Sequence, residues 1–378
     1  MTDSCLLPDF SIPEATLLVS QLFNLDGELR VLNGERDLNY LVTTDSGKFV
    51  FKIANEHESE SILECQHLVF QRLAKSSVFS HQTISQESVN GRVIESIEDK
   101  SGKQHLCRLL NYVEGRLLSE VNPHFPELLY DLGSTLATVD QSLLDFEHPA
   151  LDRPLLWKMH EVLDTLNKFK PLLASREKRT LVEYFESRFG ESLPELENQL
   201  RRSPIHNDAN DNNILIEGDS AWQQQVSSII DFGDMVYSWT VTEPAVAAAY
   251  AMLGKDHPLD AAVAIIRGYH QQLALNPAEI QIFFDLICMR LCMSVCVCAH
   301  QRSLDPDNQY LSISEKPAWA LLQKLRNIPA SFAHYVFRQA CGLEAVPRQP
   351  AVIQWLQEQS RNFRSVVDID FENDPLLW

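Results

Sequence analysis

Positively charged residues are scarce in this chain, and their scarcity limits the partners that it can bind. The 378 residues include 32 Lys and Arg against 52 Asp and Glu, a formal net charge of −20. Phosphate backbones and anionic membrane surfaces attract clustered Lys and Arg, so the sequence predicts no nucleic-acid partner and no membrane partner. A nucleotide is not excluded, because metal ions and a few local donors can neutralise its phosphates.

An export signal and a long uninterrupted apolar segment are also missing. Residues 1–5 contain no basic segment followed by an apolar one, so no secretory signal is expected and the protein is predicted to be cytoplasmic. The longest apolar stretch, residues 286–299, contains Arg290 and follows Asp285. Its length and charge predict a buried helix rather than one that spans a bilayer.

A disulfide framework is not expected, because the eight cysteines lie in a chain without an export signal. Cys288, Cys292 and Cys296 recur every four residues, which places them on one face of a helix, and Cys298 lies off that face. We interpret them as small core residues. A zinc site would need ligands from other segments, since one helix cannot supply a closed tetrahedral shell.

The pattern of the chain changes near residue 115, and this change predicts two lobes. Strands are expected at residues 38–43, 49–53, 93–96 and 106–113, and a helix at residues 58–74. Later segments are mainly helical, at residues 126–140, 157–169, 179–201 and 242–341, with short strands at 214–216 and 226–230.

These elements predict an α+β fold. A small N-terminal lobe of antiparallel strands would span residues 1–113, and a larger, mainly helical lobe would span residues 114–345. Residues 346–378 would form a tail or linker.

The strongest motif is a polar loop that contains His206, Asp208 and Asn213 and leads into the apolar residues 214–216. A kinase catalytic loop has this spacing, because its Asp must reach the acceptor hydroxyl while its Asn reaches a magnesium ion. An ordinary polar loop would also be rich in Asn and Asp. We interpret His206, Asp208 and Asn213 as catalytic residues.

A second motif weakens the alternative of an ordinary loop. An apolar run leads to Asp231, which Phe232 and Gly233 follow. In kinases an Asp in this position chelates the magnesium that bridges the nucleotide phosphates. The two motifs together predict a centre in which Asp208 is the base, while Asn213 and Asp231 hold the metal.

Lys52 lies in the apolar residues 49–53, where lysine is uncommon. By itself this position favours a solvated edge, but the downstream motifs favour a lysine that contacts the nucleotide phosphates. Such a lysine needs a carboxylate from the following helix, and Glu60 and Glu64 lie one turn apart. Glu64 is preferred because Glu60 lies nearer the helix N-terminus, where a carboxylate compensates the dipole.

The expected nucleotide loop, residues 32–40, contains only one glycine, Gly34, and so lacks a G-x-G-x-x-G pattern. Backbone amides of a tight turn can still hold phosphate, and Arg36 or Asn39 could add donors. An ordinary hairpin is equally compatible with this segment.

Taken together, these residues resemble the aminoglycoside phosphotransferase and choline kinase superfamily of small-molecule kinases, over about residues 17–343. Residues 34–39, 230–235 and 308–315 are similar to the hydroxylysine kinase branch. The chain departs from the family at Asn207, where a glycine is usual. This change affects local backbone freedom but removes no catalytic side chain.

The resemblance implies a protein-kinase-like fold with a small β-rich lobe above a helical lobe. In it, residues 1–113 would bind the nucleotide, and residues 114–345 would hold the catalytic and substrate-binding residues. It also implies that the nucleotide base is held at the connecting segment, here Leu110, Asn111, Tyr112 and Val113. The donor would be ATP or GTP with Mg2+, and the acceptor a hydroxyl on a small amine-bearing compound. The leading candidate is 5-hydroxylysine or a related amino alcohol, with ethanolamine, choline and homoserine behind it.

For this acceptor, Asp211, Asp234 and Glu243 are the candidate partners of the ammonium group. If the acceptor is an amino acid, Arg290 or Arg302 could receive its carboxylate. Glu243 and Arg290 could equally form ion pairs within the core.

Two other functions stay open. One is an aminoglycoside O-phosphotransferase, and the other is a catalytically silent kinase-like binding module, which the presence of the base, the metal ligands and the lysine disfavours. Similar bacterial kinases are sometimes fused to an aminotransferase-like phospholyase. The apolar end of the acidic tail, at Trp378, would suit such a domain beyond it.

Overall fold

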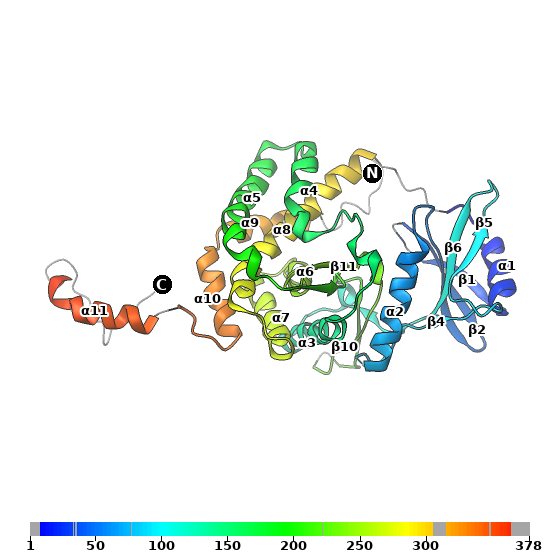
Figure 1. Cartoon of the computed structure of the whole chain (residues 1–378), viewed down its shortest axis with the longest axis horizontal. Helices are drawn as coiled ribbons and strands as arrows, with labels where there is room; N and C mark the ends of the chain where they lie inside the picture. Colours follow the sequence, from blue (N-terminus) through cyan, green and yellow to red (C-terminus); the bar gives the residue numbers. More distant parts are fainter. Residues whose placement is uncertain are drawn as a thin grey trace.

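The computed structural model describes residues 8–32, 34, 36–76, 78–220, 222–304, 315–347 and 349–363, with side chains up to residue 359. These residues form a small lobe rich in β-strands and a larger helical lobe (Figure 1). The predicted α+β organisation with an antiparallel N-terminal sheet is therefore confirmed. The lobe boundaries stay predictions.

The small lobe is built on a six-stranded antiparallel sheet in the order β1-β2-β3-β6-β4, with β5 also paired to β6. In this register Lys52 of β3 lies opposite Arg108 of β6. The strands are β1 Glu28–Leu32, β2 Leu38–Thr44, β3 Gly47–Ile53, β4 Ser85–Gln86, β5 Glu95–Glu98 and β6 Gln104–Asn111.

Helix α1, Ile12–Phe23, covers the outer face of this sheet (Figure 1). Ser11 and Glu14 cap its first turn, and Val19 packs into the small core beneath it. The sequence analysis did not identify α1 or β1. Leu17 is exposed, so apolar residues lie on more than one face of this helix. The one-sided apolar stripe by which a sequence pattern reveals an amphipathic helix is therefore weak.

Helix α2, Glu60–Ser76, lies between the lobes and confirms the helix expected at 58–74 (Figure 1). Leu63 packs in a small cluster of the N-terminal lobe. Val69, Phe70 and Leu73 instead belong to the core of the helical lobe. Packing therefore ties α2 to both lobes, although the sequence places it among the strands.

The larger lobe is mainly helical. Its helices are α3 Pro126–Leu143, α4 Val162–Phe169, α5 Arg176–Leu196, α6 Thr242–Ala251, α7 Pro258–Gln272, α8 Pro277–Leu304, α9 Glu315–Arg326 and α10 Ala330–Ala340. Two of them differ from the prediction: α4 begins later than residue 157, and α5 ends before residue 201. The segment before α4 ends in the short 3-10 helix Met159–Glu161 instead of extending the α-helix. Contacts outside the helix hold it, because the Trp157 carbonyl accepts from Asn207 and His160 contacts Ser238.

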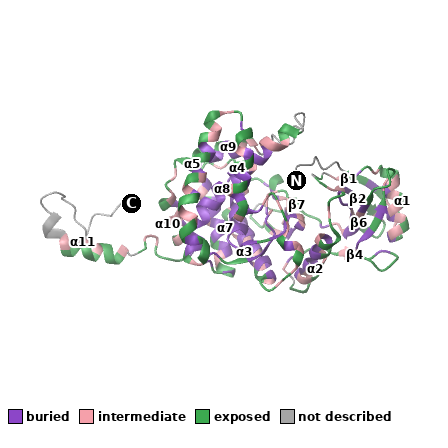
Figure 2. Ribbon diagram, turned by 45° about the horizontal axis from the view of Figure 1, so that its top comes forward, coloured by how far each residue is buried: buried purple, intermediate pink, exposed green. Residues whose placement is uncertain are grey.

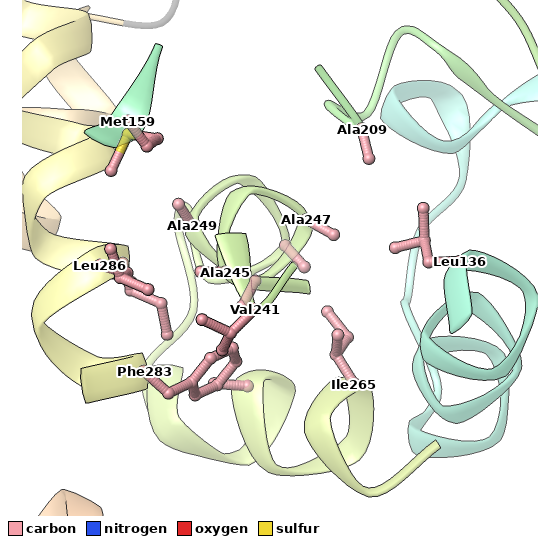
Figure 3. Packing of buried hydrophobic residues seen from close by; sticks show 14 of the residues in the cluster. Leu136, Met159, Ala209, Val241, Ala245, Ala247, Ala249, Ile265, Phe283 and Leu286 are labelled. Atoms are coloured by element: carbon pink, nitrogen blue, oxygen red, sulfur yellow. The ribbon is translucent and has the colours of Figure 1, made fainter. Parts of the chain in front are cut away.

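Small residues let the helices of this lobe approach closely. A Cβ atom on Gly133 of α3 would lie 2.0 Å from the Ile265 carbonyl oxygen of α7, so only glycine fits there. Half of the ten residues of helix α6 are alanine, and the helix packs among α3, α7 and α8. Figure 3 shows Ala247 on its side toward Ala209 and Leu136. Since Ala209 follows Asp208, this packing supports the catalytic loop from behind.

Two small sheets position the catalytic segments. One has the order β10-β9-β7, and in the other β8 pairs with β11, both sheets antiparallel. The strands expected at 214–216 and 226–230 are confirmed as β9 and β10, whereas β7, β8 and β11 were not predicted, because two- and four-residue strands give little pattern. Their bounds are β7 Arg116–Leu117, β8 Arg202–Ile205, β9 Ile214–Glu217, β10 Gln225–Ile229 and β11 Val236–Trp239.

Helix α8 is the predicted buried helix. It is long and apolar enough to cross a membrane by composition, but 89% of its most apolar window is buried inside the protein. Cys288, Cys292 and Cys296 are fully buried free thiols of this helix. In the described part of the chain no group of three or more His, Cys, Asp and Glu side chains could hold a metal. The interpretation as core cysteines is confirmed.

Helix α11, Gln349–Phe363, lies apart from both lobes (Figure 1). The described side chains of this helix are exposed or half-exposed (Figure 2). It occupies the first part of the predicted tail, and the expectation about Trp378 lies outside the described residues.

Candidate active site

Two loops meet at the centre of the molecule. Residues 206–213 connect β8 to β9, and residues 230–235 connect β10 to β11. The N–H of Ile230 donates to the carbonyl of Asn213 at 2.9 Å, which holds the loops side by side. The two motifs of the sequence are therefore brought together.

His206 connects these loops. Its Nδ1 accepts the backbone N–H of Asp208 at 3.2 Å, and its Nε2 donates to the carbonyl of Ile230 at 3.0 Å. The neutral tautomer with its hydrogen on Nε2 satisfies both contacts. The ring is fully buried and edge-on to Phe232. His206 was predicted as catalytic, but its burial makes it a residue that positions the catalytic loop.

Asp208 presents a carboxylate that is 22% exposed. Its Oδ2 accepts from the side-chain amides of Asn210 and Asn213, each at 2.9 Å, and its Oδ1 accepts from Nη2 of Arg290 at 2.8 Å. Burial raises the pKa of Asp208 to about 7, and the Arg290 cation opposes that rise. A carboxylate that titrates near neutrality is suited to accept a proton from a hydroxyl.

Arg290 lies on α8 with its side chain 2% exposed. Its guanidinium carbon is 4.5 Å from the ring centroid of Trp157 and 5.6 Å from that of Tyr250. Nη2 is also 3.4 Å from the Tyr250 hydroxyl. The core ion pair that the sequence left open is therefore present, and its carboxylate is Asp208.

Asp231 follows β10 in the left-handed region, with φ of 60°. Its side chain is 53% exposed, and Nζ of Lys52 lies 4.0 Å from its Oδ1. The Lys52 cation, followed by Arg36, lowers the pKa of Asp231 to about 2. Asp231 is therefore ionised at physiological pH, as a metal ligand must be.

Asn213 and Asp231 fit the protein part of a magnesium site. Nδ2 of Asn213 donates to Asp208, which leaves its amide oxygen available. Mg2+ prefers oxygen ligands and is usually held by one or two carboxylates together with phosphates and water. One carboxylate and one amide oxygen are consistent with a metal that the nucleotide helps to hold.

The predicted pairing of Lys52 with Glu64 is not found. Glu64 is exposed on α2, because its neighbours Leu63 and Cys65 are the residues that the helix buries. Glu60 lies 3.8 Å from Arg92. The carboxylate near Lys52 is Asp231, so the role assigned to Glu64 is corrected.

The turn between β1 and β2 contains the predicted phosphate-binding residues, although residues 33 and 35 lie outside the described part. A Cβ atom on Gly34 would lie 2.4 Å from the Asp37 carbonyl oxygen, so glycine is required there. Asn39 is 9% exposed, and its amide lies 3.4 Å from the same carbonyl. Asn39 therefore supports the turn rather than extending toward a phosphate.

Arg36 crosses from this turn to the larger lobe. Its Nη2 forms an ion pair with Asp234, and this carboxylate raises the pKa of Arg36 further. Arg153 donates to the carbonyl of Gly233 in the same segment. The residues after Asp231 are therefore surrounded by cations from both lobes.

The connecting segment is well anchored. The Asn111 amide donates to the carbonyl of Gln82 at 2.8 Å, and the N–H of Tyr112 donates to the carbonyl of Lys48 at 2.9 Å. Leu110 and Val113 are buried. Contact between this segment and a nucleotide base stays a prediction.

The structure separates the three carboxylates that were expected to meet an ammonium group. Glu243 is fully buried and accepts the backbone N–H of Asn207 at 2.8 Å, so it holds the loop that contains Asp208. Asp234 is already paired with Arg36. Asp211 is half-buried, has no ion pair among the described residues, and has a pKa that burial raises. Asp211 is the remaining candidate.

Arg302 is not a site residue. It pairs with Glu315, and it lies 12 residues beyond Arg290, or about 18 Å along α8. The expectation that it receives a substrate carboxylate is corrected.

Asn207, the departure from the family pattern, has a structural explanation. Its φ is 68°, a conformation that glycine adopts freely and that asparagine tolerates better than most residues. Its amide donates to the carbonyls of Trp157 and Asp234. The side chain thus holds the loop in the conformation that a glycine would allow.

Comparison with known proteins agrees with this geometry. The phosphotransferase enzyme family matches residues 28–282. The hydroxylysine kinase of Bos taurus is 30% identical over 341 residues, which cover 84% of this chain and 90% of that relative.

Solved structures share the fold. A microcompartment-associated aminopropanol kinase has a TM-score of 0.66 at 16% identity and covers 89% of this chain and 100% of its own. An amicoumacin kinase in complex with AMP-PNP and Ca2+ has a TM-score of 0.65 at 15% identity and covers 85% of this chain and 96% of its own. The protein-kinase-like fold is confirmed, and the chain belongs to the phosphotransferase enzyme family, as a small-molecule kinase that acts on an alcohol group.

Proposed function

We propose that this kinase transfers the γ-phosphoryl group of ATP or GTP, with Mg2+, to the hydroxyl of a small amine-bearing metabolite, with 5-hydroxylysine or a related amino alcohol as the acceptor. The observation that carries the proposal is the Asp208 carboxylate, held by Asn213 beside the loop in which Lys52 meets Asp231. The names of the bovine relative and of the aminopropanol kinase support an acceptor that has both a hydroxyl and an amine.

In this proposal Asp208 accepts the hydrogen bond of the acceptor hydroxyl and takes its proton as the new oxygen–phosphorus bond forms. Asn210 and Asn213 hold Oδ2, which fixes the direction of the carboxylate. Lys52 lies where it can contact the nucleotide phosphates next to Asp231. Magnesium, when bound, neutralises phosphate charge.

Asp211 would receive the ammonium group of the acceptor. It is half-buried, lies in the same loop as the base, and has no competing cation within the described ranges. An ammonium group that replaces bulk water beside it gains a charge-assisted hydrogen bond. Neutral alcohols should therefore be poor acceptors.

A panel of acceptors tests the proposal. Nucleotide consumption would be measured with ATP and with GTP against 5-hydroxylysine, homoserine, ethanolamine, choline and their deaminated analogues. We expect the best amine to exceed its deaminated analogue at least about tenfold in kcat/KM. Asp211→Asn should remove most of that difference, while the matched change Asp219→Asn, at an exposed position of the β9–β10 turn, should leave it intact.

The same measurements also test the competing functions. Kanamycin as the preferred acceptor would favour an aminoglycoside phosphotransferase. Nucleotide binding without turnover on any acceptor would favour a silent binding module. Equal efficiency toward an amine and its deaminated analogue would refute ammonium recognition and leave the kinase activity standing.

A further inference from the structure

The Arg290 side chain has hydrogen-bonding capacity that the protein does not use. A guanidinium carries five N–H donors, and in the described part of the chain Nη2 of Arg290 has two acceptors, Asp208 and Tyr250. Nε and Nη1 are buried and have no hydrogen-bond partner among the described residues. Leaving such donors unpaired costs about 1–3 kcal/mol each, and more when the group is charged, so this position calls for an acceptor from outside the chain.

The position of these donors restricts the kind of ligand that could accept their hydrogen bonds. Because Arg290 lies 2.8 Å from the catalytic carboxylate, a molecule whose hydroxyl contacts Asp208 also comes close to the guanidinium. The rings of Trp157 and Tyr250 flank that cation, at 4.5 Å and 5.6 Å. An ammonium group would be repelled there, whereas an anion would be attracted.

Carboxylate is the anion that best matches the remaining donors. Arg presents its donors as planar forks that bind carboxylate with two parallel hydrogen bonds. Nη2 has two hydrogens. One stays on Asp208, and the other would leave its 3.4 Å contact with the Tyr250 hydroxyl to form such a fork together with Nη1 or Nε. A lysine could not serve both carboxylates in this way, because its ammonium has no fixed fork.

We propose that Arg290 determines specificity by binding the carboxylate of an amino-acid acceptor, so that one guanidinium holds both the catalytic base and the substrate. This inference rests on the proposed function and narrows its acceptor to a hydroxyl-bearing amino acid. The acceptor would lie with its carboxylate at Arg290, its hydroxyl at Asp208 and its ammonium at Asp211. Amino alcohols without a carboxylate would leave the fork of Arg290 unpaired.

The first test uses the unaltered protein and needs no turnover. Calorimetry in the presence of Mg-ADP would compare lysine with cadaverine, which differ only by the carboxylate. We expect lysine to bind roughly 10- to 100-fold more tightly, because a charge-assisted hydrogen bond usually changes affinity by about this factor. Equal affinity of the two, or tighter binding of cadaverine, would overturn the inference.

The second test separates the carboxylate contact from the contact with Asp208. The ratio of kcat/KM would be measured for 5-hydroxylysine against its decarboxylated diamino alcohol, and for homoserine against its decarboxylated aminopropanol. Any damage to Asp208 lowers kcat/KM for both acceptors of a pair, so it cancels in their ratio. Arg290→Met should bring the ratio to within about threefold of one, and Arg290→Lys should leave an intermediate value.

Arg302→Met on the same helix is the matched control and should keep the wild-type ratio, because Arg302 pairs with Glu315. If the ratio stays at its wild-type value in the Arg290 variants, Arg290 does not contact the carboxylate and acts only on Asp208 or on the phosphoryl group. The calorimetric comparison keeps the inference testable should the variants fold poorly. A preference for lysine over cadaverine without turnover on any acceptor would support the carboxylate site while refuting the proposed activity.

Discussion

The two loops of the candidate active site each carry one aspartate, and the two aspartates have opposite acid–base properties. Burial raises the pKa of Asp208 to about 7, whereas the Lys52 cation lowers the pKa of Asp231 to about 2. A carboxylate near neutrality can exchange a proton, while one that is always ionised can only bind cations. The environments, rather than the residue type, therefore suit Asp208 to the proposed role of base and Asp231 to the proposed role of metal ligand.

The two environments also come from different parts of the molecule. The partners of Asp208 are Asn210, Asn213 and Arg290, all from the larger lobe. The cation nearest to Asp231 is Lys52, from the small lobe. The pKa of Asp208 thus depends on one lobe, whereas the pKa of Asp231 depends on how the two lobes meet.

The largest effect is expected from Asp208→Asn, which keeps the shape of the side chain and removes the base. Turnover should fall by roughly 10²- to 10⁴-fold, while the affinity for Mg-nucleotide changes little, because Asp208 acts in the transfer step. Steady-state kinetics and calorimetry would measure the two quantities. A variant that kept more than about a third of wild-type turnover would show that Asp208 is not the base.

Asp231→Ala tests the proposed role of Asp231 as a metal ligand. Removing a charged metal ligand should weaken Mg-nucleotide binding by about 10- to 100-fold and lower turnover as well. Calorimetry with Mg-nucleotide measures the affinity, and Asp219→Ala, at an exposed position, is the control. If both quantities stay at wild-type values, Asp231 merely ends a strand.

The pH dependence of the wild-type enzyme should report the two aspartates separately. Asp208 must be ionised to accept a proton, so kcat/KM should decline by about tenfold per pH unit below about pH 7. Mg-nucleotide affinity should decline only in far more acidic solution, since the pKa of Asp231 is about 2. Parallel loss of both quantities near neutrality would contradict the assignment.

Lys52→Met tests whether the small lobe sets the state of Asp231. Without this cation the pKa of Asp231 rises, so Mg-nucleotide binding should be lost at a higher pH as the solution is acidified, with affinity about tenfold lower at neutral pH. Lys48→Met, on the same strand but paired with the exposed Glu114, should show neither change. The activity midpoint that belongs to Asp208 should not move.

The smallest effect is expected at Asn207, which shapes the loop of the base without contacting the reacting groups. Asn207→Ala loses two amide hydrogen bonds and keeps the strained φ, so the free energy of unfolding should fall by about 1–3 kcal/mol. Asn207→Gly relieves the φ and should lose less. Thermal unfolding compares the variants, and a larger loss for glycine would contradict this explanation.

Local pattern was enough to find the motif residues of the site, because Asp208, Asn213 and Asp231 lie in loops whose spacing reflects their chemistry. It was not enough for residues whose role depends on a distant partner. Glu64 was assigned to Lys52 by helix spacing, yet burial of Leu63 and Cys65 turns it outward. The sequence shows no ionic partner for Asp234, but in the structure Arg36 from the other lobe forms an ion pair with it.

The sequence by itself located the two motifs and the strands β9 and β10 that adjoin them, because periodic burial and motif spacing are properties of neighbouring residues. Only the tertiary structure decided the electrostatics. Asp208 and Arg290 are 82 residues apart in the chain and 2.8 Å apart in space. Because a pKa depends on burial and on charges within a few ångströms, the different roles of Asp208 and Asp231 exist only once the chain has folded.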